Sequence, residues 1–151
     1  MNPTIEIRPA AAKDVSELYE LMRLYIVDFY RQPEPEEDKL KGLITHLLEA
    51  PSSGLQFVAE ENGELIGFAT LYFTFSTLRV KRQAILNDLF VASRARGKKV
   101  GEMLFKACLE YIRKKDFSSM TWETAKDNLV AQSLYERMGG KQSEWLVYEI
   151  N

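Results

Sequence analysis

One stretch in the middle of the chain, residues 85–112, constrains the fold more than any other. It predicts a strand, a short basic turn and a helix with one apolar face. The strand is Ile85-Leu-Asn-Asp-Leu-Phe-Val91, and the turn is Ala92-Ser-Arg-Ala-Arg-Gly-Lys-Lys99. The apolar positions of the helix are Val100, Met103, Leu104, Ala107, Cys108, Tyr111 and Ile112. We expect the rest of the chain to be organised around this unit.

The turn of this unit has the composition of an anion-binding site. A turn that opens a helix leaves several backbone N–H groups without partners. Gly97 and Gly101 allow a ligand to approach the main chain closely, because glycine has no Cβ. Four basic side chains surround the same point: Arg94, Arg96, Lys98 and Lys99. Since cations oppose the dipole at a helix N-terminus unless an anion offsets them, we expect a bound phosphate or pyrophosphate.

Length and composition predict a small globular protein. With 151 residues, 46% hydrophobic and 28% charged, we expect one domain over residues 1–151 with a single core. The net charge of −2 makes the basic turn a local feature, so we expect no nucleic-acid partner. A lone cysteine, Cys108, excludes an internal disulfide. The sequence shows neither a signal peptide nor a transmembrane run, which predicts a cytoplasmic protein with no membrane partner.

Hydrophobic periodicity and turn signals predict the element order β-α-α-β-β-β-α-β-α-β, a mixed sheet flanked by helices. The expected strands are residues 4–8, 55–60, 65–75, 85–91, 118–124 and 144–150. The expected helices are residues 15–29, 40–48, 100–112 and 131–138. Asn62-Gly63 between two apolar runs indicates a hairpin, and Gly139-Gly140 indicates the end of the last helix.

Two motifs of the chain resemble the signatures of the GNAT (Gcn5-related) N-acetyltransferases. The acetyl-CoA loop of that family has the form Gln/Arg-x-x-Gly-x-Gly/Ala. Arg94 and Gly97 match it, whereas Lys99 stands where the family usually has Gly or Ala. The second signature is Asn-x-x-Ala-x-x-Leu-Tyr-x-x-x-Gly. It is matched at five positions, which are Asn128, Ala131, Leu134, Tyr135 and Gly139.

The resemblance covers nearly the whole chain and implies the GNAT acyl-CoA N-acyltransferase fold, an α/β fold with a mixed sheet of seven strands. It implies that the strands 84–91 and 118–124 splay apart around the pantetheine arm of acetyl-CoA, the cosubstrate. The residues implied to bind this cofactor are Leu89, Phe90, Val91, Arg94, Arg96, Gly97, Lys98, Lys99, Val100, Gly101, Asn128 and Tyr135. It further implies that a homodimer can form, with residues 145–148 as an edge for pairing.

The chemistry implied by the resemblance is direct attack of a primary amine on the thioester in a ternary complex. Backbone N–H groups of residues 89–91 are the expected polarisers of the thioester carbonyl. Tyr135 is implied to protonate the sulfur as a general acid. The only histidine, His46, is far in sequence from any candidate nucleophile, so we expect no Ser-His-Asp or Cys-His mechanism. The sequence contains no cluster of Cys and His residues, so we expect no metal site.

The sequence leaves the catalytic base open. Polyamine-acetylating relatives carry a glutamate at the position matching Asn87, and an asparagine cannot accept a proton. The adjacent Asp88 lies on the opposite face of the strand unless a β-bulge redirects it. Glu123 on the expected facing strand is another candidate, and a chain of water molecules is a third. Because Asn87 removes the usual base, a non-catalytic acyl-CoA-binding or regulatory module with this fold is the alternative to an enzyme.

The acceptor is expected to be a small molecule or peptide with a primary amine. The segment 31–38 joins the first two helices, a connection that lines the acceptor side in GNAT relatives. It carries four acidic residues: Glu34, Glu36, Glu37 and Asp38. These residues have two interpretations: they favour the start of the second helix through its dipole, or they attract a cationic amine to the cleft.

Overall fold

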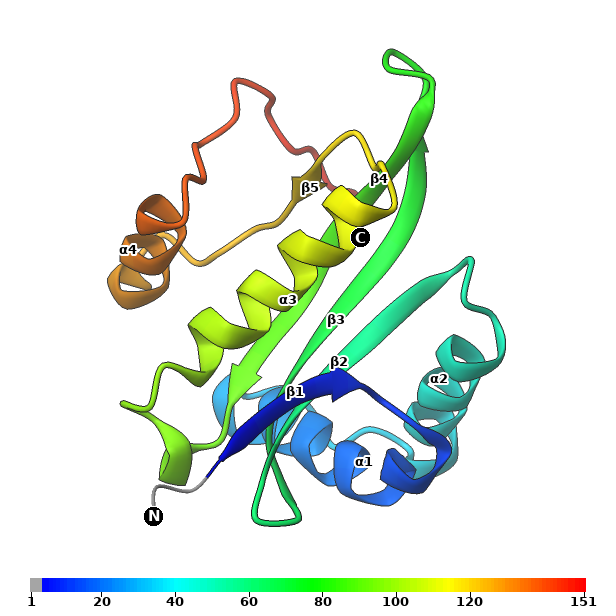
Figure 1. Ribbon diagram of the computed structural model, residues 1–151, viewed down its shortest axis with the longest axis vertical. Helices are drawn as coiled ribbons and strands as arrows, with labels where there is room; N and C mark the ends of the chain where they lie inside the picture. Colours follow the sequence, from blue (N-terminus) through cyan, green and yellow to red (C-terminus); the bar gives the residue numbers. More distant parts are fainter. Residues whose placement is uncertain (1–3) are drawn as a thin grey trace.

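The computed structural model describes residues 4–151 and contains one mixed sheet of five strands (Figure 1). The strands run in the order β1 (Ile5–Pro9), β2 (Gly54–Glu61), β3 (Glu64–Ser76), β4 (Lys81–Val91) and β5 (Met120–Thr121). The first four strands are antiparallel to one another in sequence order, and β5 is parallel to β4. The parallel pair is the one that α3 connects, as expected from a crossover through a helix.

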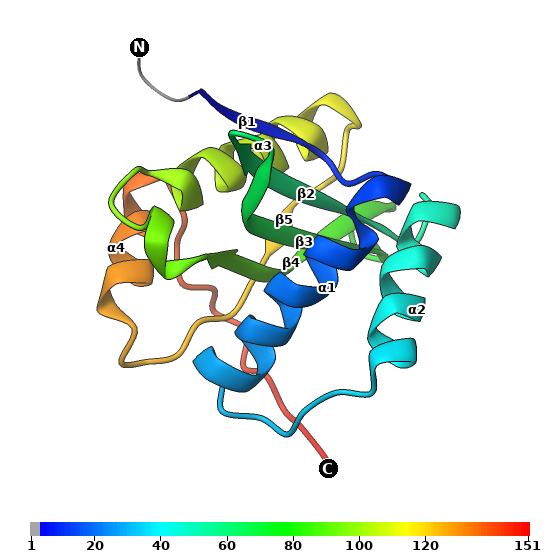
Figure 2. The ribbon, with the colours of Figure 1, turned by 90° about the horizontal axis from the view of Figure 1, so that it is seen from below.

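Helices cover both faces of the sheet (Figure 2). They are α1 (Val15–Leu24), α2 (Glu37–Glu49), α3 (Val100–Lys114) and α4 (Leu129–Arg137), with the short helices η1 (Ala12–Asp14), η2 (Tyr25–Phe29) and η3 (Ser93–Ala95). One half of the core lies between the sheet and α3, and the other lies between the sheet and the pair α1 and α2. Within residues 4–151, no helix is long and apolar enough to cross a membrane.

The predicted hairpin between β2 and β3 is confirmed. Asn62 and Gly63 both have positive φ angles, 53° and 81°, which a two-residue hairpin turn of this kind requires. The end of α4 at the two glycines is also confirmed. A Cβ on Gly140 would lie 2.9 Å from the ring of Trp122, so this position needs glycine for close packing.

A β-bulge interrupts the pairing of β3 with β4. Leu86 pairs with Leu71, and Asp88 pairs with Thr70, so Asn87 is an extra residue on β4. From the sequence, Asp88 was expected on the opposite face of the strand unless a β-bulge redirected it. The structure contains such a bulge.

The bulge changes the face to which the side chains of β4 point. Before it, Ala84 and Leu86 pack in the half of the core beneath α3. After it, Phe90 packs in the half beneath α1 and α2, whereas Leu89 packs against the α3 side. In a regular strand residues 84, 86, 88 and 90 would share one face, because side chains alternate with a period of two. The extra residue therefore directs Asp88 towards α1.

The prediction of a strand at residues 144–150 was wrong. Within the described residues this segment forms no strand, and its apolar side chains Trp145, Leu146, Val147, Tyr148 and Ile150 are all exposed. The apolar composition of the segment favours a strand, but a strand is stable only when a neighbouring strand provides backbone hydrogen bonds. The sheet therefore has five strands and not seven. The homodimer that used residues 145–148 as its edge stays a prediction.

Two other strand boundaries differ from the sequence prediction. The expected strand 118–124 is limited to β5, since only Met120 and Thr121 pair with β4. The expected loop 76–83 is reduced to a turn at residues 77–80, because β4 pairs with β3 as far back as Lys81 opposite Ser76. The result is a long β3–β4 hairpin that extends beyond the helices (Figure 1).

Candidate active site

The edge of β4 after the bulge is free on the side of β5. Pairing between the two strands stops after Ala84 with Met120 and Ile85 with Thr121, and the chain then leads away to α4 (Figure 1). Among residues 4–151, the segment 86–91 is paired only with β3. Backbone N–H and C=O groups of this segment therefore remain available to a ligand with amide groups of its own. The predicted parting of the two strands is confirmed.

The basic turn divides its four cations into two pairs with different surroundings. The Arg94 guanidinium donates to the carbonyl oxygen of Leu65 at 3.0 Å and lies 3.6 Å from the Glu64 carboxylate. The Lys98 ammonium lies 3.0 Å from a carboxylate oxygen of Glu61. Both contacts are with the β2–β3 hairpin. Arg94 and Lys98 therefore brace the turn against the sheet.

The other two cations, Arg96 and Lys99, form no ion pair with any of the described residues. Lys99 precedes α3 with a left-handed φ of 63°, the conformation for which Gly is best suited. No side chain caps the first turn of α3, so its N–H groups point out of the helix unpaired by a cap. These groups and the two free cations form the part of the turn that fits an anion.

A cavity of about 430 Å³ opens beside this turn. Its basic end is formed by Arg94 and Arg96, and its apolar wall by Leu24, Phe29 and Phe90. Asp28 and the short segment 92–93 complete the lining. The volume lies in the range of small-molecule sites. The cavity therefore joins the anion-binding turn to the face of the sheet on which Asp88 lies.

Asp88 is a buried carboxylate surrounded by neutral polar groups. The Asn87 amide donates to it at 3.1 Å, and the hydroxyls of Thr70 and Tyr25 lie near it. Burial raises the pKa of Asp88, and these three neutral groups oppose that rise only in part. A carboxyl with a raised pKa binds a proton more readily at neutral pH than an ordinary aspartate does. Asp88 is therefore suited to accept a proton.

A row of buried polar side chains extends from Asp88 across the sheet. Gln56 on β2 lies opposite Thr70 on β3, which lies opposite Asp88 on β4. The Gln56 amide donates to the Thr70 hydroxyl oxygen at 3.0 Å. Because Thr70 accepts from Gln56, its hydrogen is free to point at Asp88. The row therefore leaves the Thr70 hydroxyl hydrogen available to Asp88.

The two buried carboxylates of the described chain have opposite surroundings. Asp14 forms a bidentate pair with Arg8, at 2.7 and 2.9 Å, and this hydrogen-bonded guanidinium lowers its pKa. Arg8 also contacts Glu60 at 3.0 Å, so this cluster ties β1 and η1 to β2. Asp88 has no cation of residues 4–151 beside it. One carboxylate is structural, and the other lacks a counter-charge.

Tyr135 lies half-buried on α4 against aromatic rings. Its ring centroid is 5.7 Å from that of Phe105 and 5.3 Å from that of Trp122. Burial raises the pKa of Tyr135, and the nearby Tyr30 raises it further. The phenol is thus protonated at neutral pH and faces the end of η2. Asn128 caps α4, since its carboxamide oxygen accepts from the Ala131 N–H at 3.2 Å.

The other candidates from the sequence lie away from this arrangement. Glu123 is exposed and follows the end of β5 by two residues. Cys108 is fully buried, and burial raises the pKa of its thiol to about 12, which makes it inert. His46 is exposed on α2. Within residues 4–151, no group of His, Cys, Asp and Glu side chains could hold a metal ion.

The acidic segment is largely occupied with neighbouring cations. Glu34 pairs with Arg23 of α1. Glu36 and Glu37 pair with lysines of α2 one turn further on, Lys39 and Lys41. Both glutamates lie at the N-terminus of α2, where negative charge is favourable. This geometry favours the helix-start interpretation over attraction of an amine.

Sequence reasoning missed two tyrosines, Tyr25 and Tyr30. Tyr25 was assigned to the apolar stripe of the first helix, whereas its hydroxyl contacts Asp88 and Tyr30. The only signal was the cluster of aromatic residues just before the proline-rich segment. A stripe of apolar residues does not reveal which of its tyrosines needs a polar partner.

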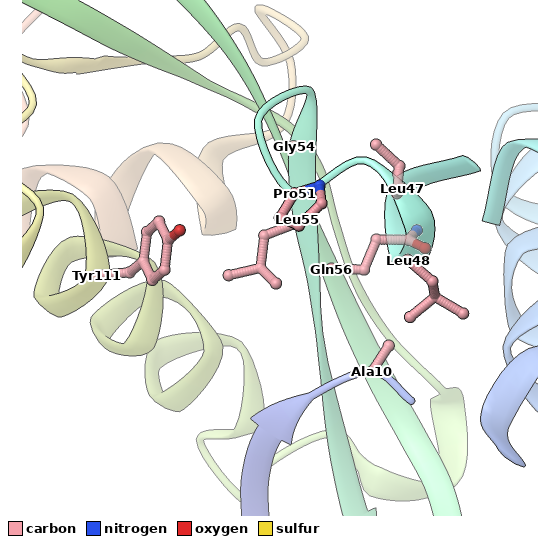
Figure 3. Close-up of a pocket in the computed structure, with 8 residues that line it drawn as sticks. All are labelled: Ala10, Leu47, Leu48, Pro51, Gly54, Leu55, Gln56 and Tyr111. Carbon is pink, nitrogen blue, oxygen red and sulfur yellow. The ribbon is translucent and has the colours of Figure 1, made fainter. Parts of the chain in front are cut away.

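A second, smaller cavity lies at the start of β2 and is unrelated to this site (Figure 3). Its volume is about 120 Å³. It is lined mainly by apolar side chains of α2 and β2, with Tyr111 reaching in from α3 (Figure 3). It contains no charged group.

Comparison with known proteins identifies related acetyltransferases. Residues 17–140 match the model of the acetyltransferase (GNAT) family. An uncharacterized N-acetyltransferase, YhfO of Bacillus subtilis (strain 168), is 37% identical over 144 residues, which cover 95% of each chain. A probable acetyltransferase of known structure is 28% identical, with a TM-score of 0.85 over 97% of both chains.

An aminoglycoside N-acetyltransferase, AAC(6')-Iy, in complex with CoA has the same fold. It is 18% identical, with a TM-score of 0.81 over 100% of this chain and 97% of that one. The family model covers most of the chain, and the fold agrees with it. The chain belongs to the GNAT family of acetyltransferases.

Proposed function

We propose that the protein transfers the acetyl group of acetyl-CoA to a primary amine by direct attack in a ternary complex. The observation that carries this proposal is the buried Asp88, which lacks a counter-charge and lies beside the free edge of β4. A non-catalytic module would gain nothing from such a carboxylate, since burial of an unpaired charge costs stability. The relative YhfO is likewise named an N-acetyltransferase.

Acetyl-CoA is the proposed cosubstrate, and the chain offers groups that fit its parts. Arg96, Lys99 and the uncapped N-terminus of α3 suit the pyrophosphate. The free edge along residues 89–91 suits the amides of the pantetheine arm, which can pair as an added strand would. Family membership supports this assignment, because a CoA complex of the same fold is known.

The proposed reaction needs one proton acceptor and one proton donor. A protonated amine loses a proton to Asp88 and then attacks the thioester carbonyl carbon, which forms the C–N bond. Backbone N–H groups near residues 89–91 stabilise the oxyanion. The C–S bond then breaks, and the CoA thiolate takes the hydroxyl proton of Tyr135. The nitrogen loses its second proton as the amide forms, and this proton restores the tyrosinate to a phenol. Asp88 releases the first proton to solvent.

Asp88 is proposed as the base in preference to Glu123. It is buried, its pKa is raised, and it lies on the face that the bulge directs towards α1. Glu123 is exposed and lies beyond the paired part of β5. Glu123 therefore lacks the burial that makes Asp88 a better proton acceptor.

Replacement of Arg96 tests the anion site. Arg96→Ala should raise the Kd of CoA roughly tenfold, because it removes a charge-assisted hydrogen bond to phosphate. Lys98→Ala is the matched control, since it removes the same charge from the same turn but a side chain that is engaged with Glu61. Its Kd should stay within about twofold of the wild-type value. Isothermal titration calorimetry with CoA measures both, and equal losses in the two variants would contradict the assignment.

Replacement of the proposed base should abolish most of the activity without harm to the fold. Asp88→Asn keeps the size of the side chain and removes the proton acceptor, so kcat should fall roughly 10²–10⁴-fold. Release of CoA thiol in the presence of an amine panel measures it. A Glu123→Gln variant with the larger loss would move the role to Glu123.

The stability of Asp88→Asn provides the control for folding and has a defined pH dependence. Because the pKa of Asp88 is raised in the folded state, the folded protein binds a proton more tightly than the unfolded chain does. The contribution of Asp88 to wild-type stability is therefore greatest below 3.8, the ordinary pKa, and is lost as pH rises through the folded-state value. Denaturant titrations should show Asp88→Asn gaining stability relative to wild type over that range. A difference that does not change with pH would refute this account.

Removal of the Tyr135 hydroxyl tests the general acid. Tyr135→Phe retains the ring that packs on Phe105 and Trp122, so the fold should be unchanged. We expect kcat to fall roughly 10²–10⁴-fold while the KM for acetyl-CoA changes little. Steady-state kinetics with a fixed amine measure both constants. Full kcat in this variant would exclude Tyr135 as the donor.

A further inference from the structure

The chain that follows α1 makes a wide π-helical turn, η2, which groups three aromatic side chains. The Tyr30 N–H donates to the Tyr25 carbonyl oxygen five residues back, at 3.0 Å. The ring centroids of Tyr25 and Phe29 are 6.3 Å apart, and those of Phe29 and Tyr30 are 4.9 Å apart. A turn of this width is rare, and it commonly marks a functional site.

This aromatic cluster has a buried side and an open side. On the buried side, Tyr25 packs edge-on against Phe68 and Phe90, at 5.5 and 5.6 Å. On the open side, Phe29 and Tyr30 are 46% and 48% exposed. Phe29 and Phe90 also form the apolar wall of the 430 Å³ cavity. Packing of the core explains the aromatic residues on the buried side. It does not explain the exposed rings of Phe29 and Tyr30.

Tyr25 connects the aromatic cluster to the buried carboxylate. Its hydroxyl contacts the side chains of both Asp88 and Tyr30. A ligand that lies against the exposed rings is therefore separated from Asp88 by the thickness of one side chain. Asp88 has no cation among the described residues, so an ammonium group is the charge that complements it.

We propose that the acceptor is a primary amine whose carbon skeleton carries an aromatic ring, which packs against Phe29 and Tyr30 while the nitrogen points to Asp88. This inference rests on the proposed acetyl transfer to amines and names the class of acceptor. Rings in stacked or edge-on contact bind each other better than their apolar area alone predicts. The glutamates near η2, Glu34, Glu36 and Glu37, are already paired with cations. Asp28 of η2 lines the cavity and is exposed to solvent.

The test compares amines that share a basic nitrogen and differ in their skeletons. The probes are 3-phenylpropylamine, n-butylamine and spermidine, each assayed with acetyl-CoA by release of free thiol. We expect kcat/KM for 3-phenylpropylamine to exceed that for n-butylamine roughly tenfold or more. A ratio near one, or a preference for spermidine, would overturn the inference while leaving acetyl transfer intact. If no amine on an extended panel releases thiol, the proposed function itself fails and the inference falls with it.

Variants of the open rings locate the preference. Phe29→Leu and Tyr30→Leu keep an apolar side chain and remove a ring, so the ratio of the two kcat/KM values should fall towards one. Tyr30→Phe keeps the ring and should keep the ratio. Phe75→Leu is the matched control, since Phe75 is 76% exposed on the β3–β4 hairpin and lies outside the cluster. An unchanged ratio in both leucine variants, or an equal fall in the control, would contradict the placement.

Discussion

The extra residue in β4 is the constraint on which the site depends. Asn87 has no partner on β3, and its presence shifts every later residue of the strand to the opposite face. In a regular strand with Asn87 paired, Asp88 would share the face of Leu86, in the apolar core beneath α3. With Asn87 bulged out, Asp88 lies opposite Thr70 and near Tyr25 on the side of α1. The bulge thus decides which helices surround the carboxylate.

The burial of the Asp88 carboxylate in this position costs stability. A buried carboxylate normally gains a cation, as Asp14 does from Arg8. Three neutral donors offset the burial of Asp88 only in part, which is why its pKa is raised. Groups held in this way concentrate at functional sites, where the charge that is missing from the protein comes from the substrate. The contrast between the two carboxylates separates a structural group from a reactive one.

The sequence predicted the fold class, the hairpin, the basic turn and the helix that follows it, because each has a strong local signal. Asn62-Gly63 and the apolar stripe of α3 are examples. Local patterns did not reveal the π-helical turn at Tyr25, and they did not separate Arg96 from Lys98, because these depend on contacts with distant segments. The strand predicted at 144–150 failed for the same reason, since strand propensity is realised only beside a partner.

The structure of the protein bound to a bisubstrate analogue, with CoA joined through its sulfur to 3-phenylpropylamine, tests the central claim most directly. We expect the nitrogen to lie about 2.6–3.2 Å from the Asp88 carboxylate, or one water molecule away from it. The sulfur should face the Tyr135 hydroxyl. A nitrogen bound instead beside Glu123, with Asp88 still enclosed by Thr70 and Tyr25 and reached by no water, would contradict the account.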